Sequence, residues 1–131
     1  IVKKLEPRYD SHVHVIDHLI HPYEARILLG EGKVTITGRM HAAVSSINMG
    51  TVPICLSYSV KFKGVIGDDF GLNDYIYQCR GDDIWYSGNV STEVIARLNM
   101  VLENRKSIVK KINDKLELVK KKSMLQIEEL F

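Results

Sequence analysis

The sequence of 131 residues has few cysteines and little excess charge of either sign. Its two cysteines, Cys55 and Cys79, fall in apolar runs typical of strands. We therefore expect buried thiols in a reducing compartment rather than a disulfide framework. The net charge is only +2, from 18 basic and 16 acidic residues. Dedicated nucleic-acid binders are usually markedly basic, so no nucleic acid is expected among the partners.

The sequence also has no apolar run long enough to cross a bilayer and no signal peptide. It contains no internal repeat and no low-complexity segment. It opens at Ile1 without an initiator methionine, so we expect it to be part of a longer protein. The expected location is the cytoplasm, including the inner face of the membrane.

Hydrophobic residues make up 45% of the chain, which is enough for the core of one ordinary domain. Apolar and turn-forming patterns predict strands at 12–16, 34–37, 52–58 and 74–79, and helices at 22–29, 40–48 and 61–66, after a short helix or linker at 1–10. This alternation predicts an α/β fold with a doubly wound parallel sheet. Residues 1–90 would form a Rossmann-like lobe and residues 91–131 a C-terminal helical extension, helical from Thr92 with a break or kink at Asn104.

Two features of the second half are open to more than one interpretation. Basic residues crowd the C-terminal quarter: Arg105, Lys106, Lys110, Lys111, Lys115, Lys120, Lys121 and Lys122. They are most simply the solvated face of an amphipathic helix; the alternative is contact with an anionic membrane surface or a polyanionic product. Trp85 and Tyr86 are expected in a loop, either packed into the core, which is the simpler interpretation, or forming a rim on which a sugar stacks.

The most informative stretch is Ile36–Ala43, where a β-branched run ends in Gly38-Arg39-Met40-His41 and a helical pattern begins at once. A helix that starts there offers free backbone N–H groups and the positive end of its dipole to an anion. Arg39 adds a planar fork that suits a carboxylate or phosphate, and His41 can move a proton near neutral pH. The alternative is a surface salt bridge for Arg39 and a capping role for His41.

A second predicted strand end carries the turn Ser57-Tyr58-Ser59 and then Lys61. The carboxyl ends of parallel strands share one edge of a sheet, so this turn should face the same cleft as Arg39. Lys61 would neutralise a phosphate as a point charge and the three hydroxyls would add hydrogen bonds. A lysine at a helix start is more often simply solvated.

Other polar clusters point less clearly to chemistry. His12, His14, His18 and His21 suggest a zinc site, but the last two fall beyond the predicted strand and no carboxylate stands at ligand spacing, so no metal is expected. Asp68 and Asp69 lie between glycines and are more typical of a turn than of an acid–base pair or a cation site.

Taken together, three blocks resemble the polysaccharide pyruvyl transferase family: Thr37-Gly38-Arg39-Met40-His41-Ala42, then Gly50-Thr51-Val52-Pro53-Ile54, then Leu56-Ser57-Tyr58 with Lys61 and Gly64. The likeness continues through Phe70-Gly71-Leu72 and the closing helices. The combination is fairly specific, although each block alone is weak. Family members often have an aspartate where this chain has Ser59, so hydrogen bonding in that turn is expected to differ.

The resemblance implies a two-lobed, glycosyltransferase-B-like enzyme that transfers the enolpyruvyl unit of phosphoenolpyruvate to two sugar hydroxyls, forming a pyruvate ketal in cell-surface or exopolysaccharide biosynthesis. This chain would be the C-terminal, donor-binding lobe. Arg39 and His41 would be catalytic: Arg39 would grip the donor, and His41 would act as a general acid or as a phosphate ligand. The substrate-binding set would be Gly38, Arg39, Met40, His41, Ser57, Tyr58, Ser59 and Lys61.

The implied partners are phosphoenolpyruvate, an acceptor sugar or lipid-linked saccharide, and the N-terminal lobe of the same protein, with peripheral contact to a membrane. No cofactor is expected beyond the donor substrate. Two alternatives remain: a nucleotide-sugar-dependent glycosyltransferase lobe, for which no acidic residue stands out to hold a ribose, and a non-catalytic interaction module.

Overall fold

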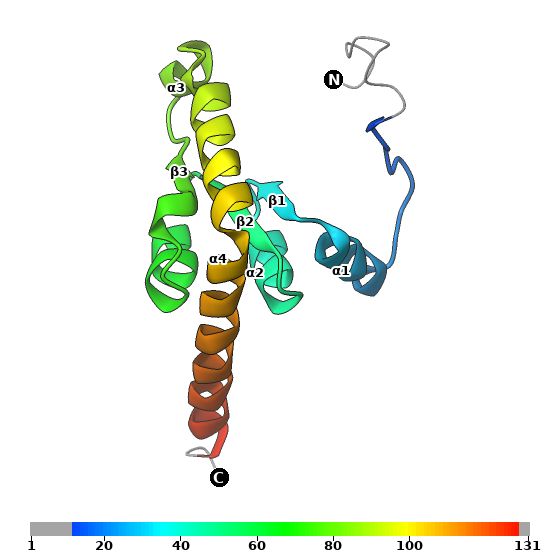
Figure 1. The fold of residues 1–131 in the computed structure, drawn as a ribbon, viewed down its shortest axis with the longest axis vertical. Coiled ribbons are helices and arrows are strands. Elements are labelled where there is room, and N and C mark those ends of the chain that lie inside the picture. Colours follow the sequence, from blue (N-terminus) through cyan, green and yellow to red (C-terminus); the bar gives the residue numbers. More distant parts are fainter. Residues whose placement is uncertain (1–11, 129–131) are drawn as a thin grey trace.

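The computed structural model describes residues 12–128 and shows a small parallel sheet interleaved with helices and flanked by one long helix (Figure 1). Its elements are α1 (Pro22–Glu31), β1 (Val34–Thr37), α2 (Met40–Asn48), β2 (Val52–Ser57), η3 (Lys63–Asp69), η4 (Asn73–Tyr75), β3 (Ile76–Gln78), α3 (Asp82–Tyr86) and α4 (Asn89–Glu128). The predicted α/β class is therefore confirmed, with α2 connecting β1 to β2 and η3 connecting β2 to β3. The predicted segment 1–10 lies outside the described residues.

The sheet has the strand order β1-β2-β3, and both strand pairs are parallel. Val34 pairs with Val52 at one end of β1, and Thr37 pairs with Cys55 at the other. Ser57, the last residue of β2, pairs with Gln78, the last residue of β3. The carboxyl ends of the strands therefore meet at one edge, which is where parallel α/β sheets bind ligands.

The strand predicted at 12–16 is wrong. Residues 13–17 have no regular secondary structure, and the side chains of Val15 and Ile16 are exposed. An extended segment becomes a strand only when a neighbouring strand pairs with its backbone hydrogen-bonding groups. Strand β1 pairs with β2 and does not pair with residues 13–17. The alternation of His and Val over residues 12–15 is typical of a strand, but it does not determine whether a second strand pairs with this segment.

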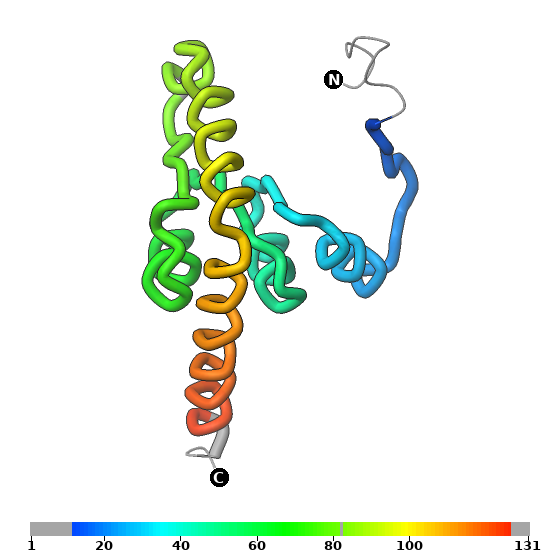
Figure 2. The backbone as a smooth tube through the Cα atoms, in the orientation of Figure 1, coloured from blue at the N-terminus to red at the C-terminus, as the bar shows by residue number. Residues whose placement is uncertain are grey.

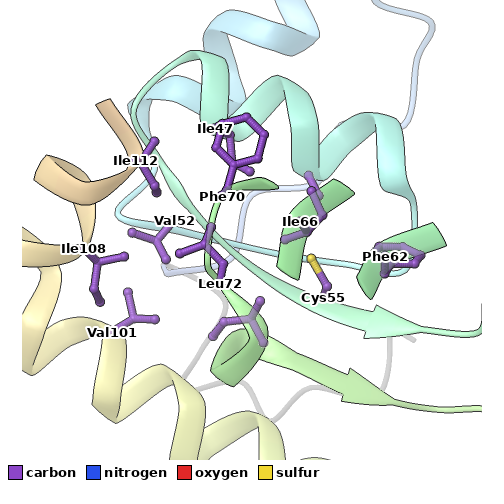
Figure 3. Close-up of a cluster of buried hydrophobic side chains, with 12 residues drawn as sticks. Ile47, Val52, Cys55, Phe62, Ile66, Phe70, Leu72, Val101, Ile108 and Ile112 are labelled. Carbon is purple, nitrogen blue, oxygen red and sulfur yellow. The ribbon is translucent and has the colours of Figure 1, made fainter. Parts of the chain in front are cut away.

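The core lies between β2, α2, η3 and α4. Figure 3 shows Val101 and Ile108 of α4 directed toward Val52 and Leu72, while Ile66 and Phe62 lie near Cys55. Along β2 the side chains at 52–55 are all buried, whichever way the pleat directs them. A strand buried in this way reads as a continuous apolar run, which is why it was predictable.

Helix α4 runs unbroken for 40 residues, so the break predicted at Asn104 is wrong. The Asn104 side chain donates to the carbonyl of Met100 at 3.0 Å, and Ser107 donates to the carbonyl of Asn104 at 2.8 Å. These polar groups are satisfied along the helix itself, so they do not interrupt it. The C-terminal end of α4 extends past α2 and η3 (Figure 2). Within the described chain no helix is both long and apolar enough to span a membrane.

The lysines of α4 face mainly outward. Lys110 and Asp114 form an exposed ion pair at 2.8 Å, and Lys120 and Glu117 form another at 3.2 Å. The hydrogen bond and the charge of Asp114 raise the pKa of Lys110 above its ordinary value. Such exposed pairs add little to stability. The exposed lysines agree with a solvated face, and contact with an anionic surface stays the alternative prediction.

Thr51 connects the end of α1 to the start of β2 through side-chain hydrogen bonds. Its fully buried hydroxyl lies 3.2 Å from the carbonyl oxygens of both Gly30 and Gly32, at the end of α1. A valine has nearly the same shape but cannot donate. We expect Thr51→Val to lower the free energy of unfolding by about 1–2 kcal/mol, measured by urea denaturation. Thr92→Val, on the exposed surface of α4, is the matched control, and equal stabilities of the two variants would contradict the assignment.

Candidate anion-binding site

A pocket of about 320 Å³ lies where the chain leaves β1 and β2 at the shared edge of the sheet. Its lining residues are Arg39, Met40, His41, Ala42, Tyr58, Ser59, Lys61 and Phe62. Six of the eight residues predicted to bind substrate are among them. The structure thus brings together two segments that the sequence separates by 16 residues or more.

The first side of the pocket is the N-terminal end of α2. The first backbone hydrogen bond of this helix runs from the N–H of Ala43 to the carbonyl of Arg39 at 3.2 Å. The N–H groups of Met40, His41 and Ala42 precede it, and no side chain caps them. Three backbone donors and the positive end of the helix dipole are therefore available to an anion at the pocket.

The backbone entry into α2 is set by Thr37, the last residue of β1. Its hydroxyl accepts a hydrogen bond from the N–H of Arg39 at 2.9 Å. A threonine hydroxyl that bonds two residues onward stabilises a tight turn. Arg39 is thereby held at the start of the helix in an extended backbone conformation (φ −110°, ψ 122°), with its side chain exposed.

The second side of the pocket uses a similar device at the end of β2. The buried hydroxyl of Ser57 donates to the carbonyl of Ser59 at 2.9 Å, which closes the turn. Tyr58 lies against Phe62 with the ring centroids 5.9 Å apart and the planes inclined at 72°. This edge-to-face contact is favourable and orients the otherwise exposed Tyr58 ring.

The pocket is positively charged without internal compensation. Arg39, His41 and Lys61 line it, while no Asp or Glu does. Across residues 12–128 none of these three side chains forms a hydrogen bond or an ion pair. Arg39 and Lys61 lack counter-charges, and the His41 ring and free helix N–H groups lie beside them. Together they form a site suited to a small anion with carboxylate or phosphate oxygens.

Two predicted binding residues, Gly38 and Ser57, are not part of the lining. The Ser57 hydroxyl is used in the turn described above. Gly38 has no positive φ, and a Cβ added there would lie 3.6 Å from the carbonyl oxygen of Leu56, an ordinary contact. Their roles in binding stay predictions.

The sequence did not single out Phe62 and Ala42 as lining residues. Phe62 is almost fully buried and links the pocket to the core. Its spacing of four from Tyr58, across the turn that leads into the next helical segment, is the signal that could have indicated contact between the two rings. Ala42 contributes to the pocket mainly through its backbone N–H and its small side chain, and its residue type gives no sign of either role.

The other polar clusters lie elsewhere. His21 caps α1: its Nδ1 accepts from the N–H of Tyr23 at 3.2 Å, while Glu24 accepts from the N–H of His21 at 2.8 Å. Asp68 and Asp69 are exposed within η3 rather than in a tight turn. Among residues 12–128 no three His, Cys, Asp or Glu side chains gather as a metal site.

Both cysteines are free and buried, and neither lines the pocket. Burial raises the pKa of the Cys55 thiol to about 12, from an ordinary value of 9.0. Burial also raises the pKa of Cys79, although the nearby charge of Arg97 acts in the opposite direction. Both thiols therefore remain protonated and unreactive in the folded protein.

This protonation predicts a fall in stability at alkaline pH. Between about pH 9 and pH 12 unfolding exposes Cys55, which then loses a proton that the folded state keeps. We expect the free energy of unfolding to fall through this window by up to about 1.4 kcal/mol per pH unit from this thiol. Urea denaturation of the protein and of Cys55→Ala should give a shallower pH slope for the variant. Equal slopes would contradict the assignment.

Comparison with known proteins gives one match. The family model for polysaccharide pyruvyl transferase matches residues 2–60. Residues 2–60 are therefore similar to the polysaccharide pyruvyl transferase family, over less than half of the 131-residue chain. The match includes Arg39, His41 and the Tyr58 turn, and ends one residue before Lys61. No curated protein and no solved structure matches the chain. The likeness to the pyruvyl transferases beyond Val60 stays an expectation from the sequence.

Proposed function

We propose that this chain is the donor-binding, C-terminal lobe of a two-lobed, glycosyltransferase-B-like polysaccharide pyruvyl transferase. It would bind phosphoenolpyruvate in the pocket between β1 and β2. The pyruvyl group would then pass to a sugar, forming a ketal in cell-surface or exopolysaccharide biosynthesis. The match of residues 2–60 to the pyruvyl transferase family supports a transferase with a pyruvyl donor and a saccharide acceptor.

The observation that carries this proposal is the composition of the pocket. Arg39, His41, Lys61 and the free N–H groups of α2 converge without a carboxylate. Phosphoenolpyruvate carries a carboxylate and a phosphate on a frame of three carbons, so it needs several donors close together. A volume of about 320 Å³ lies at the lower end of the range for small-molecule sites, which favours such a donor over a bulkier nucleotide-sugar.

The reaction balances as one donor and two hydroxyls giving a ketal and inorganic phosphate. A proton is added to the methylene carbon of phosphoenolpyruvate, and the first sugar hydroxyl bonds to the central carbon. The second hydroxyl then bonds to the same carbon as the C–O bond to phosphate breaks. The phosphate leaves with the electron pair of that bond, and the hydroxyl protons pass to it and to solvent.

In this scheme the residues of the pocket have distinct roles. Arg39 binds the carboxylate or phosphate through two parallel hydrogen bonds, which also orient the donor. Lys61 and the N–H groups of α2 stabilise the charge that builds up on the leaving phosphate. His41, as imidazolium, supplies the proton to the methylene carbon or to the phosphate.

Calorimetric titration with phosphoenolpyruvate tests the proposal. We expect saturable binding that inorganic phosphate competes for, and weaker binding for Lys61→Ala. Lys63→Ala removes an equal charge two residues away and outside the lining, so it should leave binding unchanged. Preferential binding of a nucleotide-sugar such as UDP-glucose would instead support a glycosyltransferase lobe, and binding of neither would leave only an interaction module.

A further inference from the structure

A pair of aromatic side chains lies exposed beyond the end of β3. The core position expected for Trp85 and Tyr86 is wrong: Trp85 is 53% exposed and Tyr86 is 88% exposed, and they belong to the short helix α3 rather than to a loop. Exposed tryptophan and tyrosine are enriched at interaction surfaces, because each ring offers an apolar face and a polar group. Packing in the core therefore does not account for the positions of Trp85 and Tyr86.

The Trp85 indole is nevertheless held in place. Its Nε1–H donates to the carbonyl of Cys79 at 3.3 Å, directly after β3. The N–H of Cys79 in turn donates to the carbonyl of Ser57 at 2.7 Å, at the end of β2. Two hydrogen bonds thus connect the indole to the residue that precedes Tyr58 in the pocket. Neighbouring strands are about 4.8 Å apart, so the aromatic pair lies along the same sheet edge as the pocket.

Two polar side chains lie close to the aromatic pair along the chain. Arg80 follows Cys79 and is exposed, and it forms no hydrogen bond or ion pair with the described residues. Gln78, the last residue of β3, is also exposed. Planar guanidinium and amide groups bind vicinal hydroxyls through paired hydrogen bonds. An exposed ring face together with such groups would match a pyranose, which has an apolar C–H face and a rim of hydroxyls.

We propose that Trp85, Tyr86 and Arg80 form a saccharide subsite that holds the acceptor beside the donor pocket. The C–H face of one sugar ring packs on the indole, whose π face carries negative charge, and Arg80 binds hydroxyls at its edge. This inference rests on the proposed function, because that function requires a sugar near the donor. It adds the residues and the binding mode, which the family match does not assign, since that match ends at Val60.

Intrinsic fluorescence tests the subsite directly, because Trp85 is the only tryptophan in the chain. The protein is titrated with the methyl glycosides of glucose, galactose and mannose, and with glycerol as a polyol that has no ring. We expect at least one glycoside to change the emission saturably and glycerol not to. Tyr86→Ala and Arg80→Ala should each weaken that glycoside severalfold, and Trp85→Leu, followed by saturation-transfer NMR, should weaken it about tenfold.

Tyr23→Ala is the matched control, because Tyr23 is another exposed tyrosine, on α1, far along the chain from the subsite. It should leave glycoside binding unchanged. A saturable response to none of the glycosides would overturn the inference, as would full binding by the Trp85→Leu variant with its fold intact by circular dichroism. Phosphoenolpyruvate titration of the same protein separates the two proposals: donor binding without glycoside binding rejects the subsite alone, and the reverse rejects the donor pocket.

Discussion

Arg39→Ala is expected to weaken phosphoenolpyruvate binding at least tenfold, the largest effect of any single substitution in the pocket. Arg39 stands at the start of α2 with an exposed side chain and no ion pair within the described chain. No internal partner has to be broken when it binds an anion. A charge-assisted hydrogen bond contributes about 1.5–3 kcal/mol, and a paired arginine–carboxylate or arginine–phosphate contact uses two of them. Isothermal titration calorimetry measures the loss.

Two further variants make this result specific. Arg39→Lys keeps the charge but loses the planar fork, so its affinity should lie between those of the protein and the alanine variant. Arg26→Ala removes an exposed arginine of α1 that does not line the pocket, so it should bind normally. If Arg26→Ala and Arg39→Ala weakened binding equally, general electrostatic attraction would explain the affinity, and the pocket would not.

Phe62→Ala is expected to lower the free energy of unfolding by about 3–5 kcal/mol, the largest effect on stability. Phe62 is 1% exposed and joins the core that α2, β2, η3 and α4 share. Removing its ring deletes buried contacts and leaves a cavity that the surrounding elements cannot fill. Urea denaturation with the linear extrapolation method measures the change.

The same substitution should also disturb the pocket, because the Phe62 ring supports Tyr58. We expect weaker phosphoenolpyruvate binding even where the variant remains folded. Val60→Ala is the matched control, since Val60 is 83% exposed two residues away and its loss should change neither property measurably. A destabilisation by Phe62→Ala no larger than that of Val60→Ala would contradict the packing described here.

Much of the fold was predictable where local pattern and burial agree. The strand at 34–37 and the helix at 40–48 have the predicted bounds, and β2 differs by one residue. These segments combine β-branched runs, a turn glycine and a continuous apolar stretch, and each signal indicates the same structure. Residues 12–16 and Asn104 were predicted wrongly because their pattern was local, whereas strand pairing and helix continuity depend on neighbours.

The candidate site was predictable for a similar reason. Parallel strands place their carboxyl ends at one edge, so the turns after β1 and β2 had to be neighbours once the sheet was parallel. The residue types at those turns indicated an anion. Phe62 was missed because its part in the pocket depends on how η3 leads away from β2. The exposure of Trp85 was missed because apolar character alone predicts burial.

The sequence by itself determined the chemistry at the strand ends: an arginine, a histidine and a lysine placed at turns, with serine and tyrosine hydroxyls beside them. Only the tertiary structure decided that these groups share one pocket without a carboxylate, and that Trp85 is held at the next strand end with its ring exposed. The reason is physical. Turn chemistry acts over two or three residues, while a pocket and an exposed surface arise only when strands pair and helices pack across many.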